Sequence, residues 1–221
     1  MAGLFYVVST PIGNLEDITF RAVKTLKEVD LIATEDTRKI KVLLTKYNIH
    51  TPATSYFQYN RKIKDDYLIT LLKKGKHIAL VSNAGTPLIS DPGFSLIRRL
   101  IDEKICFTVI PGASAVTSAV VISGIKCDDF IFLGFLPRKE GKIKKIFREL
   151  SLVKKSLVFF ESPFRIKATV EILSKLELFS EMAIVKEMTK RFEEVIRGSI
   201  QEVNEIIKKR SLKGEITVVL R

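Results

Sequence analysis

The segment best suited to chemistry is LVSNAGTPLISDPG, residues 80–93, which leads from a strand-like apolar run into a helical pattern. It contains Gly85, Pro87, Pro92 and Gly93. Glycine lets backbone approach a ligand closely, and proline stiffens a loop. Because a turn between a strand and a helix usually needs only about 2–6 residues, this longer loop favours ligand binding over an ordinary turn. Its polar residues offer anchors for a ligand and a possible helix N-cap: Ser82, Thr86, Ser90 and Asp91.

Three further segments follow strand-like runs, namely STPIGNLEDIT (9–19), ATEDTRK (33–39) and PGASAVTSA (111–119). The carboxylates beside an arginine in the second segment can orient a hydroxyl group or accept its proton. An exposed helix cap with a surface ion pair explains them equally well. The small residues of the third can admit a ligand to backbone N–H groups at a helix start, or they simply allow close helix packing.

The chain carries 37 Lys and Arg against 25 Asp and Glu, a net charge of +12. Such an excess attracts polyanions, although it also describes an ordinary solvated surface. A predicted helix at 138–150 concentrates cations that could neutralise several phosphates, again unless it is a solvated helix face. Tyr56, Phe57 and Tyr59 lie beside cations and could stack on a base or pack within a loop.

Several classes of protein are disfavoured. The sequence has no GxGxxG and no GxxxxGK[ST], so it lacks the usual phosphate-binding loops. Cys106 and Cys127 are isolated, and we expect both to be reduced packing residues. The two histidines, His50 and His77, argue against a metal site or a histidine-based triad. We expect no metal, no membrane span and no signal peptide, and therefore a cytoplasmic protein.

The apolar patterns predict an α/β fold with two domains, residues 1–112 and 113–221. Strands are predicted in the first half at 4–9, 31–34, 77–82 and 106–110, with helices between them, the first capped by Asp17 or Thr19. This alternation is typical of a mostly parallel sheet covered by helices. The second half is richer in strands, which suggests a mixed sheet: 130–135, 156–161, 182–188, 194–199 and 215–221, with helices at 138–150, 165–176 and 200–209.

The chain resembles the ribosomal RNA small-subunit methyltransferase I family, which belongs to the tetrapyrrole-methylase-like enzymes. The resemblance lies in the order of the four loop segments described above, followed by GFLPRK, FFESPFR and KEMTK. The resemblance extends over about residues 4–220. It implies two α/β domains of the tetrapyrrole-methylase type with S-adenosylmethionine in the interdomain cleft. It also implies methyl transfer to the ribose 2′-oxygen of a cytidine in the decoding region of 16S rRNA, within the small ribosomal subunit, by a homodimer.

The resemblance further implies roles for single residues. Glu35, Asp36 and Arg38 would face the substrate, and we expect Glu35 or Asp36 to accept or orient the hydroxyl proton while Arg38 holds phosphate. Lys190 would be a rival base if desolvation lowered its pKa. The residues implied to contact the methyl donor are Pro11, Gly85, Thr86, Ile89, Ser114, Ala115, Phe135, Leu136, Glu187 and Thr189.

The sequence departs from the family pattern at two places. Asn83 replaces the aspartate of VSDAGTP, and residues 57–61 read FQYNR where the family usually has His-Glu-His-Asn-Glu. Two alternatives therefore stay open. One is a methyltransferase of the same fold that acts on a tetrapyrrole or a modified protein histidine. The other is a non-catalytic ribosome-binding factor, which the lost charge at Asn83 favours.

Overall fold

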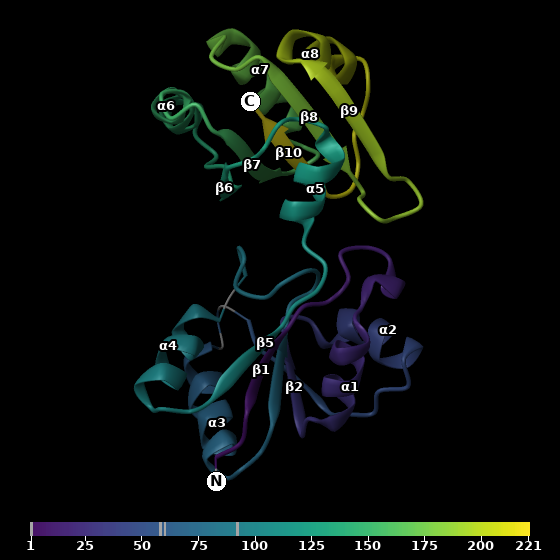
Figure 1. The fold of residues 1–221 in the computed structure, drawn as a ribbon, viewed down its shortest axis with the longest axis vertical. Coiled ribbons are helices and arrows are strands. Elements are labelled where there is room, and N and C mark those ends of the chain that lie inside the picture. The colour runs from purple at the N-terminus through teal and green to yellow at the C-terminus, as the bar shows by residue number, and fades with distance from the viewer. Residues whose placement is uncertain (1, 58, 60, 92) are drawn as a thin grey trace. The chain divides into compact units, whose positions relative to one another are not determined.

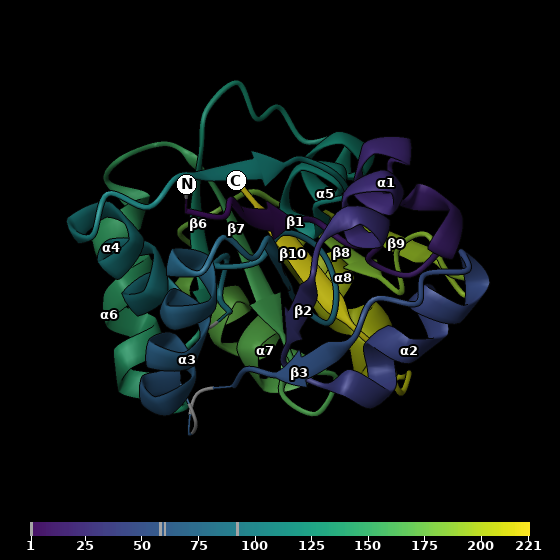
Figure 2. The same cartoon turned by 90° about the horizontal axis from the view of Figure 1, so that it is seen from below.

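The computed structural model describes residues 2–57, 59, 61–91 and 93–221, and the chain folds as two compact units, Met1–Ser114 and Ala115–Arg221 (Figure 1). The boundary expected from the sequence lies between residues 112 and 113. Each unit has a five-stranded sheet of its own (Figure 2). Among the helices in the described part of the chain, none is long and apolar enough to cross a membrane.

The sheet of the first unit is parallel throughout, as predicted, with the strand order β3-β2-β4-β1-β5. Residues in β1 and β4 are almost entirely buried, which explains their continuous apolar pattern. The strands are β1 (Phe5–Val8), β2 (Leu31–Thr34), β3 (Ala53–Ser55), β4 (Ile78–Val81) and β5 (Phe107–Ile110).

Helices cover both faces of this sheet (Figure 1). On one face α1 (Phe20–Glu28) and α2 (Thr37–Lys46) pack through a core that includes Leu26 and Leu43. On the other, α3 (Arg61–Lys73) and α4 (Phe94–Asp102) pack through a core that includes Leu68 and Leu100. A short 3₁₀ helix, η1 (Leu15–Asp17), precedes α1. With both faces covered, the carboxyl ends of the strands are the edge left for a ligand.

Several local expectations for this unit need correction. Thr19 caps α1 through a 3.1 Å hydrogen bond from the Ala22 amide, whereas Asp17 belongs to η1. The N-cap of α4 is Gly93, so Asp91 does not cap that helix. Cys106 is exposed rather than packed, because it lies just before the edge strand β5.

The sheet of the second unit is mixed, as predicted, with the order β6-β7-β10-β8-β9. Only β6 and β7 pair in parallel, and the remaining pairs are antiparallel. The strands are β6 (Phe130–Phe135), β7 (Ser156–Glu161), β8 (Glu181–Lys186), β9 (Glu194–Ser199) and β10 (Ile216–Leu220). The helices are α5 (Ala115–Ser123), α6 (Glu140–Ser151), α7 (Ile166–Leu176) and α8 (Ile200–Lys208). The apolar faces of α6, α7 and α8 share one core, to which α6 contributes Ile143 and Phe147.

Candidate functional site

The loops that follow β1 and β4 are joined at the carboxyl edge of the first sheet. Thr10 and Gly85 form a two-residue bridge, with amide-to-carbonyl distances of 2.9 and 3.0 Å. The Ser9 Oγ lies 2.9 Å from the Thr86 Oγ1. Gly85 has a φ of 79°, a conformation that favours glycine. This bridge brings Pro11, Gly85 and Thr86, three of the residues implied by the resemblance, into one place.

The loop after β5 approaches the same edge. A Cβ built on Gly112 would lie 3.0 Å from the Cβ of Ser9, so a side chain at position 112 would require the two loops to move slightly apart. A Cβ on Gly85 would lie 3.8 Å from the Ala113 carbonyl oxygen. Three strand-end loops therefore converge, which is the arrangement in which open α/β sheets bind ligands.

The middle of the loop after β4 has an unusual backbone. Leu88 and Ser90 have φ values of 76° and 69°, in the left-handed region that side chains other than glycine rarely adopt. Such conformations cost about 1–3 kcal/mol each and concentrate at functional sites. The side chain of Ile89, between them, is 48% exposed. This geometry supports a ligand-binding loop over an ordinary turn. Pro92 lies outside the described residues.

Two carboxyl groups and an amide gather beside this loop. The Asn83 side-chain amide donates a 2.6 Å hydrogen bond to the Glu35 carboxylate. Burial raises the pKa of Glu35, and the charge of Lys39 opposes the shift. Burial, followed by the negative charge of Glu35, raises the pKa of Asp91 to about 6, against a hydrogen bond with Ser82 that lowers it. Asp91 can therefore gain or lose a proton close to neutral pH, and Glu35 takes up a proton more readily than an ordinary glutamate, which suits acid–base chemistry.

Asp36 and Arg38 have a different role in the structure. Asp36 is the N-cap of α2 and accepts a 2.9 Å hydrogen bond from the Arg38 amide. The Arg38 guanidinium pairs with the same carboxylate at 3.0 Å, and the Arg38 side chain is 90% exposed. The side-chain and backbone hydrogen bonds of Arg38 lower the pKa of Asp36 to about 2. This is the exposed cap with a surface ion pair that the sequence left as an alternative.

In the second unit, Phe135 is the last residue of β6, just after an irregularity in its pairing with β7, and Leu136 follows the strand. The Phe135 side chain is 62% exposed, whereas Leu136 is buried in the core. The Arg165 guanidinium donates to the Leu136 carbonyl at 3.2 Å and to the Pro137 carbonyl at 2.8 Å. We expect Phe135 to offer its ring to a ligand, and Leu136 to offer backbone.

Arg165 is in turn held by Glu161, whose side chain is fully buried. Glu161 lies 3.5 Å from the Arg165 Nε and accepts hydrogen bonds from the Thr169 hydroxyl at 2.7 Å and the Ser162 amide at 2.8 Å. The sequence singled out FFESPFR only as a motif and gave no role to these two residues. The available signal was a glutamate at the end of a predicted strand followed by an arginine at the start of a predicted helix.

The KEMTK segment has left-handed backbone at Glu187 and Thr189, with φ values of 52° and 64°. Lys190 forms ion pairs of 2.9 Å with Glu187 and with Glu215. Burial by itself would lower the pKa of Lys190, but the two carboxylates outweigh it and raise the pKa. The condition under which Lys190 would act as a base is therefore not met, and its ammonium group stays protonated.

Other sequence features are placed as follows. Tyr56 is fully buried and its hydroxyl donates to Asp65 at 2.8 Å, so it packs instead of stacking on a base. Tyr59 is exposed, and Gln58 and Asn60 lie outside the described residues. Ser114 and Ala115 are half-buried at the start of α5. Among the described residues, no group of three or more His, Cys, Asp or Glu is arranged to hold a metal ion.

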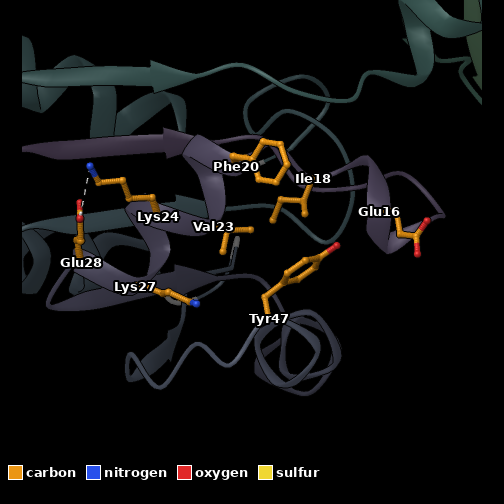
Figure 3. Close-up of a pocket in the computed structure, with 8 residues that line it drawn as sticks. All are labelled: Glu16, Ile18, Phe20, Val23, Lys24, Lys27, Glu28 and Tyr47. Carbon is orange, nitrogen blue, oxygen red and sulfur yellow. Dashed lines mark ion pairs between the residues drawn. The ribbon is translucent and has the colours of Figure 1, made fainter.

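A separate groove of about 520 Å³ lies on the outer surface of α1 (Figure 3). Phe20, with 97% of its surface exposed, and Tyr47 supply aromatic surface, and Lys24 pairs with Glu28 at 3.9 Å. The groove contains none of the predicted site residues, and its two lysines are balanced by two glutamates. Its lining residues are Glu16, Ile18, Phe20, Val23, Lys24, Lys27, Glu28 and Tyr47. The carboxyl edge of the first sheet remains the candidate site.

The raised pKa of Asp91 predicts an effect on stability. The folded state holds a proton on Asp91 up to a pH of about 6, against an ordinary value of 3.8, so its stabilising contribution is complete at low pH and is lost as pH rises through about 6. Because Asp91 is only half-buried, solvent reduces the effect to about 1 kcal/mol. Asp91→Asn should therefore increase the free energy of unfolding by about 1 kcal/mol at pH 7 and by much less at pH 4. Urea denaturation at both pH values measures this, and equal changes would contradict it.

Comparison with known proteins gives a consistent result. The sequence matches the family described as Tetrapyrrole (Corrin/Porphyrin) Methylases over residues 4–204. It is 46% identical to a Thermotoga maritima protein named "Ribosomal RNA small subunit methyltransferase I", covering 99% of this chain and 98% of that one. Proteins of the same name from Hydrogenobaculum sp. and Bacillus subtilis are 49% and 43% identical, over 97% and 99% of this chain and 94% and 75% of theirs.

Solved structures share the fold at much lower sequence identity. A cobalt precorrin-4 methyltransferase superimposes with a TM-score of 0.73 at 14% identity, over 99% of this chain and 94% of that one. A uroporphyrin-III C-methyltransferase from Thermus thermophilus, complexed with S-adenyl homocysteine, gives 0.66 at 15% identity, over 98% and 96%. At such identities the likeness establishes the fold alone.

Proposed function

Because the chain belongs to the ribosomal RNA small subunit methyltransferase I family, within the tetrapyrrole methylases, we propose that it methylates 16S rRNA with S-adenosylmethionine as donor. The acceptor we propose is the ribose 2′-oxygen of a cytidine in the decoding region. The observation that carries the proposal is an identity of 43–49% to these relatives over nearly the whole chain.

The residues at the carboxyl edge of the first sheet fit the methyl donor. Gly85 and Gly112 let the strand-end loops approach one another closely, and Ser9 and Thr86 add hydroxyl groups. The carboxyl groups of Glu35 and Asp91 favour a positively charged ligand. S-adenosylmethionine, when bound, supplies a methyl carbon attached to a positively charged sulfur, which a nucleophilic oxygen can attack. Pro11, Gly85, Thr86, Ile89 and Ser114 are the donor contacts we propose in this unit.

Glu35 is the residue we propose to take the proton from the ribose hydroxyl. The new oxygen–carbon bond forms as the sulfur–carbon bond breaks, and the hydroxyl proton passes to the Glu35 carboxylate. The hydrogen bond from Asn83 fixes the orientation of Glu35, and Asn83 does so without the repulsion that a second carboxylate would bring. A general base in this position typically accelerates a reaction by about 10²–10⁴-fold.

The remaining residues implied by the resemblance have other proposed roles. Arg38, exposed at the start of α2, binds a substrate phosphate. Lys190 acts as a fixed cation in place of a base, with Glu187 and Glu215 holding it. In the second unit, Ala115, Phe135, Leu136, Glu187 and Thr189 remain proposed donor contacts. Asp36 serves to begin α2.

The two alternatives have weaker support. Solved tetrapyrrole methyltransferases share the fold, but at 14–15% identity their substrates do not transfer to this chain. A non-catalytic ribosome-binding factor was favoured by the lost charge at Asn83. That residue orients Glu35 in the structure, which is compatible with catalysis.

We further propose that the protein works in the cytoplasm, where small ribosomal subunits are assembled, and that it forms a homodimer. The edge strand β5, with Phe107 and Val109 exposed to 37% and 48%, offers a surface for a second copy. Sedimentation of the purified chain tests the dimer, which a monomer at micromolar concentration would exclude.

The function itself is tested with purified small subunits from a strain that lacks this protein. We expect the chain to transfer one labelled methyl group per subunit to 16S rRNA, and mapping to place it on a cytidine 2′-oxygen. Calorimetry should show that S-adenosylmethionine binds. Transfer to a base instead of a ribose would overturn the proposed acceptor, and donor binding without any transfer would favour the ribosome-binding factor.

A further inference from the structure

Helix α6 carries more positive charge than its own acidic residues can neutralise. Ion pairs join Lys144 to Glu140 at 2.7 Å and Lys145 to Glu149 at 3.8 Å. Among the residues that the structure describes, no carboxylate lies within ion-pair distance of the other cations of this segment. These are Arg138, Lys139, Lys142 and Arg148, all of them exposed. By contrast, Lys175 on α7 and Lys208 on α8 each pair with a glutamate of their own helix at 2.7 Å.

The cations of α6 lie on one side of the helix. Ile143 and Phe147 face the core of the second unit, with exposed fractions of 3% and 0%. Lys142, Lys145 and Arg148 follow one another at intervals of three residues, on the side opposite this buried pair. The Lys145 side chain is 76% exposed even with its glutamate partner nearby. The core contacts hold the helix in place while its cationic face points to solvent.

The position of this face in the chain relates it to the proposed site. Arg138 is the second residue after Leu136, and α6 follows directly from the end of β6, the edge strand of its sheet (Figure 1). A helix of this length extends about 18 Å. That distance is long enough to follow several successive phosphates of a nucleic acid strand. A chain of phosphates beginning near Leu136 would thus meet a cation at each turn of α6.

We infer that the cationic face of α6, formed by Lys142, Lys145 and Arg148 together with Arg138 and Lys139 just before the helix, binds the phosphate backbone of the rRNA substrate. The inference rests on the proposed function and adds to it the surface that holds the substrate. The α1 groove is a weaker candidate for this role, because its lysines are balanced by glutamates. Contacts to phosphate do not depend on the nucleotide sequence. The α6 face therefore contributes affinity, while the proposed active site selects the nucleotide.

The test compares two variants of equal net charge in the full-length protein. The double variant Lys142→Gln/Arg148→Gln removes two exposed cations of the α6 face. The control Lys74→Gln/Lys209→Gln removes two exposed lysines at the ends of α3 and α8. Binding to unmethylated small subunits is measured by filter binding between 50 and 200 mM salt, roughly the range over which phosphate contacts are weakened most clearly.

We expect the α6 variant to bind roughly tenfold more weakly than wild type at physiological salt. Its plot of log affinity against log salt should be shallower by about 1.4–2, since each phosphate contact contributes about 0.7–1 to the slope. The control should match wild type in affinity and in salt dependence. Each of the two variants should keep the donor affinity and melting temperature of wild type. Equal affinities and slopes for the two variants would overturn the inference while leaving the proposed function intact.

Two other outcomes are distinguishable. If the wild-type chain binds small subunits but transfers no methyl group to them, the proposed function fails, and a weakened α6 variant would still support the phosphate-binding surface. The wild-type chain could instead fail to bind small subunits but bind vesicles that contain phosphatidylserine. If the α6 variant then fails to bind these vesicles, the surface recognises lipid headgroups and the inference about RNA is wrong.

Discussion

Replacing Glu35 by glutamine should slow methyl transfer about 10²- to 10⁴-fold, because the amide cannot accept the ribose hydroxyl proton. Glutamine keeps the size of the side chain and a carbonyl oxygen that can accept the 2.6 Å hydrogen bond from Asn83. The local structure should therefore survive, and the donor affinity should fall much less than the rate, because only one of the two carboxyl groups near the donor is removed. Single-turnover transfer from labelled S-adenosylmethionine to small subunits measures the rate, and calorimetry measures the donor affinity.

Asp36→Asn is the matched control for this experiment, since it removes the adjacent carboxylate in the same way. Asparagine is as good an N-cap as aspartate, so α2 should begin normally. The exposed pair with Arg38 contributes little, and we expect a change of less than about threefold in rate. An unchanged rate in Glu35→Gln together with a large loss in Asp36→Asn would exchange the roles of the two residues.

The pH dependence should separate Glu35 from a purely structural residue. Only the ionised carboxylate can take the proton, so the rate should rise with pH as Glu35 ionises and then level off. Because burial raises the pKa of Glu35, the rise should be centred above the ordinary glutamate value of 4.5. In Glu35→Gln this limb should disappear from the profile of the residual rate. If the rise of rate with pH persists unchanged in Glu35→Gln, a group other than Glu35 causes it.

The strands that the sequence predicts well are those with a continuous apolar run. β1 and β4 are apolar throughout because helices cover both faces of the parallel sheet, and such runs are easy to recognise. β3 went undetected because its three residues, Ala-Thr-Ser, are exposed or half-buried and have no apolar pattern. It is a strand only because β2 offers it a parallel partner, which is a tertiary effect.

The candidate site shows a similar division. The glycine-rich loop after β4 was recognisable, because glycine and proline leave a clear local signal. The roles of the charged residues could not be recognised in the sequence, because these roles depend on partners that are distant along the chain. Lys190 is held protonated by Glu215, 25 residues away, and Asp91 is influenced by Glu35 across two strands of the sheet. No local pattern shows which carboxylate will lie beside which cation.

The ion pair between buried Glu161 and partly exposed Arg165 leads to the largest expected change in stability. Arg165→Ala should reduce the free energy of unfolding by about 2–3 kcal/mol, less than for a fully buried pair, because Glu161 would be left buried without its cation. The Leu136 and Pro137 carbonyls would lose their donors at the same time. Urea denaturation gives the loss of stability. Since β6 ends at these carbonyls, the affinity for S-adenosylmethionine, measured by calorimetry, should fall as well.

Two further variants separate the charge of Arg165 from its geometry. Arg165→Lys restores a cation near Glu161 but cannot reach both carbonyls as the planar guanidinium does, so it should recover part of the stability and little of the donor affinity. Glu161→Gln/Arg165→Met removes both charges and should be more stable than Arg165→Ala, because no unpaired charge stays buried. If Arg165→Lys instead recovers full donor affinity, Arg165 acts through its charge alone, and the carbonyl contacts do not position the end of β6. If all three variants unfold like wild type, the pair contributes nothing to stability.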